Sequence, residues 1–110
     1  LALSNLFGVK LCAAQLCGAS LSRAMLLEAD FKSADCDMVD LSGATVSRSN
    51  FAHTSLQEAD LEGATFIDSD LSFATLVDAN LASTVFVNCN LKHADLRETR
   101  HSLDPQSSFG

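Results

Sequence analysis

The chain has 110 residues, of which 47% are hydrophobic, with seven Phe, no Trp and no Tyr. Its length fits one domain, and its apolar side chains, mainly Leu and Ala, indicate one environment used many times. The net charge of −7 argues against direct binding to nucleic acid. Because no apolar run reaches the roughly 20 residues that span a bilayer, we expect no membrane partner either. The sequence begins with Leu rather than Met, so we expect a further segment to precede it.

A period of five residues organises the chain from its first residue. Every fifth residue from Leu1 to Leu96 is apolar, and we call these residues the centres. The residue two places before each centre is small or β-branched. Residues two apart in an extended segment point to the same side, so each pair is predicted to face a common core. The residue between them is Asp or Asn in half of the repeats and is expected to face water.

The two residues after each centre are predicted to turn the chain through a corner. Four of the five glycines occupy the second of these positions, where a type II turn requires a positive φ. These corner glycines are Gly8, Gly18, Gly43 and Gly63.

If each corner turns by a right angle, four pentapeptides close one coil and residues twenty apart stack. Taken in chain order, the first wall then has its centres at Leu1, Leu21, Leu41, Leu61 and Leu81, and the second wall at Leu6, Leu26, Val46, Phe66 and Phe86. The third wall has its centres at Leu11, Phe31, Phe51, Leu71 and Leu91. The fourth wall has its centres at Leu16, Cys36, Leu56, Leu76 and Leu96. Phe stacks on Phe twice in this arrangement, which favours four walls. The predicted core comprises Leu21, Leu26, Phe31, Leu41, Val46, Phe51, Leu56, Leu61, Phe66, Leu71, Leu76, Leu81, Phe86 and Leu91.

Segments such as Ala29-Asp30-Phe31-Lys32-Ser33 and Ala59-Asp60-Leu61-Glu62-Gly63 resemble the A(D/N)LXX consensus of pentapeptide-repeat proteins. The resemblance implies an all-β fold, a right-handed quadrilateral β-helix of about five coils of four pentapeptides. The solenoid is expected over residues 1–100, with a terminating turn or tail over residues 101–110. An open coil end invites a cap or end-to-end self-association.

The charged residues are distributed unequally among the walls. The fourth and first walls together carry nine carboxylates against Arg23 and Arg97, which accounts for the whole net charge, whereas the charges of the other two walls cancel. We call these nine residues the acidic strip: Asp35, Asp37, Asp40, Glu58, Asp60, Glu62, Asp78, Asp95 and Glu98. The strip either binds a protein partner with a basic surface or serves solubility alone.

The residues that most often carry chemistry are scattered. Cys36 and Cys89 are expected to point inward about three coils apart, too far for a disulfide, while Cys12 and Cys17 point outward. His53 and His93 share one column with Phe73 between them, which is too wide for joint metal ligation. We therefore expect no catalytic, metal or cofactor site and no enzyme. Four unpaired thiols suggest a reducing, cytoplasmic compartment.

Two functions remain open on the sequence. The first is a non-catalytic structural or protein-interaction module, part of a larger protein or assembly. The alternative, which the family resemblance implies, is an acidic DNA mimic that binds a type II topoisomerase, as quinolone-resistance members do.

Overall fold

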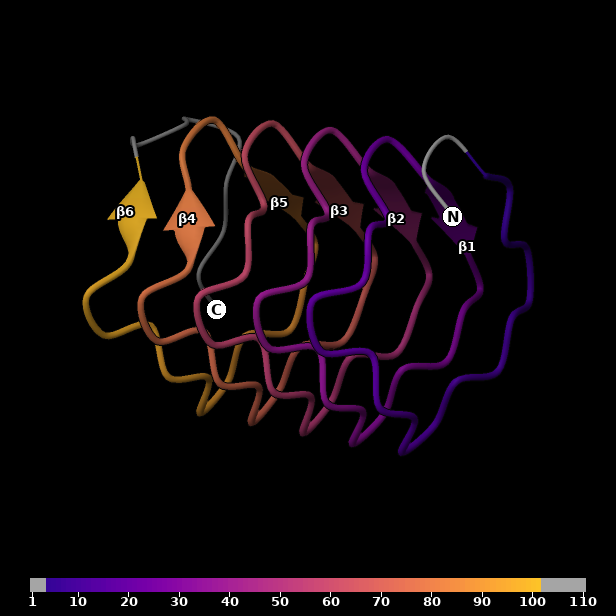
Figure 1. Ribbon diagram of the computed structural model, residues 1–110, viewed down its shortest axis with the longest axis horizontal. Coiled ribbons are helices and arrows are strands. Elements are labelled where there is room, and N and C mark those ends of the chain that lie inside the picture. Colours follow the sequence, from indigo (N-terminus) through magenta and orange to yellow (C-terminus); the bar gives the residue numbers. More distant parts are fainter. Residues whose placement is uncertain (1–3, 102–110) are drawn as a thin grey trace.

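The computed structural model describes residues 4–101, which wind into a right-handed quadrilateral β-helix. Figure 1 shows successive coils side by side along the long axis of the rod. The extents of the molecule are 29 × 20 × 20 Å, as expected for coils of square cross-section. The predicted fold class is confirmed.

Short parallel strands connect each coil to the next. On the second wall, β1 (Met25–Leu27), β2 (Thr45–Ser47), β3 (Thr65–Ile67) and β5 (Val85–Val87) form a four-stranded sheet in that order. On the first wall, β4 (Asn80–Leu81) pairs with β6 (Arg100–His101). Elsewhere the described coils meet at single bridges, such as Asp30↔Asn50. Every pair joins residues twenty apart, which confirms four pentapeptides per coil.

The interior is filled by the centres and by the small residues that precede them. All fourteen predicted core residues are buried, and Leu91, the most exposed of them, is only 5% exposed. The rings of Phe31 and Phe51 stack with centroids 4.6 Å apart, and those of Phe66 and Phe86 stack at 5.2 Å. Burial of each such side chain contributes roughly 1.5–3 kcal/mol. The core therefore supplies most of the stability of the rod.

The corners hold the backbone in a conformation that usually favours glycine. The second corner residue has a positive φ in every described repeat, 67–73° at the four glycines and 50–62° at fifteen other residues. Most corners are closed by a hydrogen bond, as when the Ala44 N–H donates to the Leu41 carbonyl at 3.0 Å. Outside glycine this left-handed conformation costs about 1–2 kcal/mol per residue. Stacking between coils must therefore offset strain at most corners.

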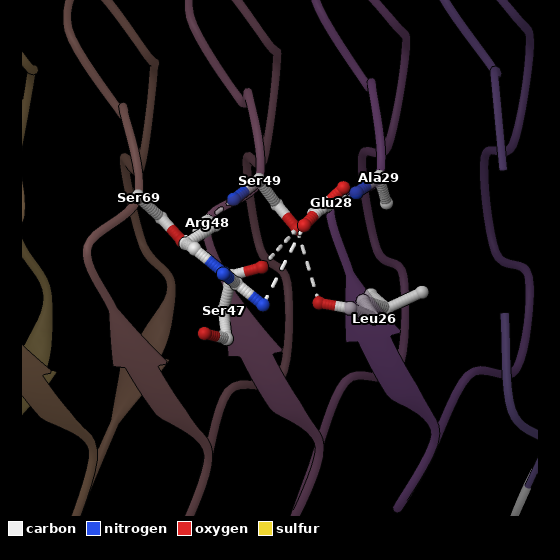
Figure 2. A network of polar contacts seen from close by, with 7 residues as sticks. All are labelled: Leu26, Glu28, Ala29, Ser47, Arg48, Ser49 and Ser69. Atoms are coloured by element: carbon white, nitrogen blue, oxygen red, sulfur yellow. Dashed lines mark hydrogen bonds and ion pairs between the residues drawn. The ribbon is translucent and has the colours of Figure 1, made fainter. Parts of the chain in front are cut away.

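The corner between the second and third walls differs from the expected turn. The backbone bond that would close it is absent between Leu26 and Ala29, and the Ala29 N–H donates instead to Ser49 Oγ in the next coil at 3.1 Å. Figure 2 shows Ser49 Oγ directed at the Leu26 carbonyl, 3.0 Å away. The Ser49 N–H donates in turn to Ser69 Oγ at 3.1 Å. Buried hydroxyls thus replace the missing turn bond and join three coils.

Candidate interaction surface

The Asp or Asn before each centre has a structural role beyond facing water. Its Oδ1 accepts a hydrogen bond from the backbone N–H two residues later, at 2.9–3.2 Å. This N–H lies at the start of the corner, where an Asx turn gives it a partner within the same repeat. Nine of the ten Asp and Asn residues at this position do so: Asp30, Asp35, Asp40, Asn50, Asp60, Asp70, Asn80, Asn90 and Asp95.

Asp37 supplies the same kind of bond from the neighbouring coil. In the next coil, Ser55 occupies the position before the centre where many other repeats have Asp or Asn. Its shorter side chain does not accept a hydrogen bond from the Gln57 N–H, which is left for another acceptor. Asp37 Oδ1 accepts from the Gln57 N–H at 2.9 Å and from the Ser55 hydroxyl. The carboxylate therefore ties two coils of the fourth wall together.

The acidic strip divides into two groups in the structure. Asp35, Asp37, Asp40, Asp60 and Asp95 accept hydrogen bonds from the backbone. Among the described residues, no hydrogen bond or ion pair engages the carboxylates of the other four, which are all exposed: Glu58, Glu62, Asp78 and Glu98. The first group stabilises corners, and the second is available to a partner.

Of the cations on the walls of the strip, Arg97 pairs with one of its carboxylates. Arg97 Nη2 contacts Asp95 Oδ2 at 2.8 Å, and Arg97 Nε also donates to this carboxylate. Hydrogen bonding to Arg97 lowers the pKa of Asp95 below its ordinary value. Both side chains are solvent-accessible, so the pair contributes little to stability. The pair cancels the charge of Asp95 and leaves Glu98 as the net negative charge at the C-terminal end of the fourth wall.

The four thiols occupy two environments. Cys12 and Cys17 are exposed, whereas Cys36 and Cys89 are buried, and all four are free. Burial, aided by the charges of Asp35 and Asp37, raises the pKa of Cys36 to about 12. Burial also raises the pKa of Cys89, against the opposing effect of its hydrogen bonds with the backbone of Ser69 and Val87. Since Cys89 Sγ lies 3.2 Å from the Phe66 carbonyl, this thiol continues the column of Ser49 and Ser69.

The two histidines frame a stacked column at the corner of the third wall. The rings of His53 and Phe73 are 4.8 Å apart, and those of Phe73 and His93 are 4.9 Å apart. The described residues contain no group of three or more His, Cys, Asp or Glu side chains arranged to hold a metal ion. Over the same part of the chain, no helix is long and apolar enough to cross a membrane.

The repeats match the pentapeptide repeats family in eight copies, with matched segments at residues 4–35, 34–72, 47–81 and 66–100. The chain therefore belongs to the pentapeptide repeat family. No curated protein sequence matches it.

Solved structures with the same fold come from several sources. A pentapeptide repeat protein from the Arabidopsis thaliana thylakoid lumen is 19% identical, with a TM-score of 0.57, and is covered over 70% of its length by 93% of this chain. QnrB1, a plasmid-mediated fluoroquinolone resistance protein, is 22% identical with a TM-score of 0.52, and 87% of this chain covers 46% of it. Rfr23 from the cyanobacterium Cyanothece 51142 is 23% identical with a TM-score of 0.49, and 97% of this chain covers 88% of it. The first two likenesses show the fold.

Two features of the surface escaped the sequence analysis. The Asx bonds had a visible signal, because an acceptor side chain two residues before a corner N–H is the pattern of an Asx turn. The outward residues of the second wall also carried a signal, since the same register that gathers carboxylates on two walls leaves none beside the centres of this one. Neither feature follows from the distribution of charged residues alone.

Proposed function

We propose that this chain is a non-catalytic protein-interaction module whose acidic strip binds a partner with a basic surface. The observation that carries the proposal is the confinement of the net charge of −7 to two adjacent walls of a rigid rod. Fixed charges on neighbouring walls steer a cationic partner and orient it. The four exposed carboxylates Glu58, Glu62, Asp78 and Glu98 form the contact, and the remaining five keep the corners in place.

A matched pair of double variants tests the strip. Glu58→Gln with Asp78→Asn removes two charges from the fourth wall, while Glu28→Gln with Asp68→Asn removes two from the second. All four residues occupy the second corner position with φ of 52–61°, so the two double variants perturb the backbone alike. We expect proteins captured by the unmodified chain to be retained by the second-wall variant and lost from the fourth-wall variant. Equal retention by both variants would contradict the proposal.

The DNA-mimic alternative rests on the same rod and the same strip. Duplex DNA carries one charge per roughly 1.7 Å, so a rod of this length would need about 17 charges to imitate it. The chain has a net charge of −7 over an extent of 29 Å. We therefore expect the domain to leave gyrase supercoiling unchanged at micromolar concentrations. Inhibition that the fourth-wall double variant abolishes would replace the proposal with topoisomerase binding.

A further inference from the structure

Beside its centres, the outward side of the second wall is largely apolar and carries no charge. Ten outward residues flank its centres, five immediately before them and five immediately after, and six of these ten are large and apolar. We call these six the apolar wall: Phe7, Met25, Leu27, Ile67, Val85 and Val87. The other four are Asn5, Thr45, Ser47 and Thr65.

The other three walls present a different surface at the same two repeat positions. Among their described residues there, Val77 on the fourth wall is the only aliphatic or aromatic side chain larger than Ala. Each of these walls carries several charged side chains at these positions, such as Asp30 and Lys32 on the third. The apolar wall is therefore a property of one side of the rod and not of the repeat.

The apolar wall is both flat and accessible. Except for Phe7 in the first coil, its side chains belong to the sheet formed by β1, β2, β3 and β5, which Figure 1 shows aligned along one side of the rod. Phe7 is 64% exposed and Met25 is 44% exposed. The charged residues of this wall lie at its corner, where Arg48 and Glu28 form a salt bridge of 3.5 Å (Figure 2). Exposed apolar surface with a polar edge is typical of an interaction site.

We propose that the apolar wall packs face to face against the same wall of a second copy of this chain. Charge selects this orientation, because the net charge of −7 lies on the first and fourth walls. The fourth wall is opposite the second, so face-to-face packing places the two fourth walls on the outside of the pair. Contact through the acidic walls would instead bring like charges together.

The size of the wall sets the strength of the contact. The extents of the whole molecule, 29 Å by 20 Å, limit one face to at most about 580 Å² per copy. Two copies would bury at most roughly 1,200 Å² together, at the low end of specific interfaces. The pair is therefore a reversible dimer that forms with increasing concentration.

The distribution of large side chains along the apolar wall suits a two-fold dimer in which the long axes of the two rods are antiparallel. Its larger side chains lie toward the two ends, in the first two and last two coils, and Thr45 and Ser47 occupy the middle coil. A two-fold axis through the middle coil pairs the first coil of one copy with the fifth of the other, and the second with the fourth. Phe7 then lies against Val85 and Val87, and Met25 and Leu27 lie against Ile67. Such an interface is self-complementary, as closed dimers require.

The test compares lysine at one repeat position on two walls. Ile67 and Val77 each follow a centre, and both are half-buried β-branched residues. In sedimentation equilibrium, the mass of the unmodified chain should rise from 11.7 kDa toward twice that value as its concentration increases. Ile67→Lys should weaken the dimer at least roughly tenfold, because an ammonium group buried without a partner is strongly unfavourable. Val77→Lys should leave the dimer intact.

Further measurements separate this dimer from other modes of association. If the circular-dichroism melting of Ile67→Lys shows unfolding, Ile67→Thr keeps the β-branched shape and should still weaken the dimer severalfold. Added salt should tighten a dimer of two acidic chains that meet through an uncharged wall, whereas it weakens binding through the acidic strip. A chain that stays monomeric up to about 500 µM, well above the dissociation constants of standard interfaces, would overturn the proposal. A dimer that Ile67→Lys leaves unchanged would also overturn the proposal and would indicate end-to-end contact. The proposal would fail as well if the chain were monomeric and Ile67→Lys abolished binding of a different protein.

Discussion

The second and third walls of the rod share one core and one repeat length but differ on their outward sides. On the third wall, Asp30, Asn50, Asp70 and Asn90 each accept the N–H that opens the corner, and the coils meet at single bridges. On the second wall, from the second coil onward, three residues of each coil pair in register with the next. A strand ladder provides partners for the backbone along its length. A wall that pairs as a sheet therefore needs no acidic or amide side chain, and its surface is free to be apolar.

The largest expected effect tests whether the two walls do share one core. Phe51→Ala on the third wall and Phe66→Ala on the second should each lower the free energy of unfolding by about 3–5 kcal/mol. The two rings contact each other edge to face at 5.8 Å, and both are fully buried. Urea denaturation gives the two values directly. A much smaller loss for Phe66→Ala would mean that the sheet wall carries its own stability.

The corner between these walls gives the next largest effect. Ser49→Ala removes the acceptor of the Ala29 N–H and the donor to the Leu26 carbonyl. Leaving buried polar groups without partners should cost about 1–3 kcal/mol of unfolding free energy. Ser49→Cys is the matched control, because Cys89 occupies the equivalent place two coils later and should be better tolerated than Ala. Equal melting temperatures for the Ala variant and the unmodified chain would show that the hydroxyl column is dispensable.

The Asx bonds are expected to give a smaller difference in stability between the third and second walls. Asp70→Ala on the third wall loses the bond to the Ser72 N–H, for an expected cost of about 0.5–2 kcal/mol. Asp70→Asn keeps the acceptor and should be nearly neutral. On the second wall, Thr65→Ala at the same repeat position should cost no more than about 0.5 kcal/mol. If the Ala variants of the two walls were equally destabilised in thermal melts, the Asx bonds would not distinguish the walls.

The effect that is smallest near neutral pH concerns the two buried thiols, and it grows only at alkaline pH. The pKa of Cys36 rises from 9.0 to about 12 in the folded chain, so the unfolded chain loses this proton first. The stability is therefore fully present below pH 9 and declines as pH rises toward 12, by at most about 1.4 kcal/mol per pH unit. Cys36→Val should flatten the decline measured by urea denaturation from pH 9 upward. Cys89→Ser should flatten it less, because hydrogen bonds with the backbone of Ser69 and Val87 oppose the rise in the pKa of Cys89. An unchanged slope in Cys36→Val would contradict this account.

The core was predictable because it depends on one regular feature. An apolar residue at every fifth place, with Phe31 and Phe51 twenty apart, determines which side chains face inward and which stack. The corners were predictable at glycine, where φ is positive at Gly43 and Gly63. The sequence offers no such signal at Phe73 or Met38, which adopt the same φ because the coils above and below impose it.

The candidate surface was less predictable than the core. Charge counting locates the acidic strip, but it cannot separate Asp60, which accepts the Glu62 N–H, from Glu62, whose carboxylate is exposed and engaged by no described residue. That distinction depends on side-chain length and on which N–H groups remain after the coils pair. The role of Ser49 at the corner between the second and third walls was not predictable either, because in the sequence Ser49 is one more small residue beside the core.

The pairing of each residue with the one twenty places later has a consequence for how such proteins change in length. Removing residues 41–60 would set Leu21 beneath Leu61 and β1 beside β3, so a rod shorter by about 4.8 Å would keep all four walls. Removing five residues would instead rotate everything downstream by a quarter turn, carrying Asp78 onto the third wall and the third-wall lysine Lys92 onto the second. Insertions and deletions that preserve the surface therefore have the length of whole coils. Each adds or removes one row of residues and leaves all other residues on their walls.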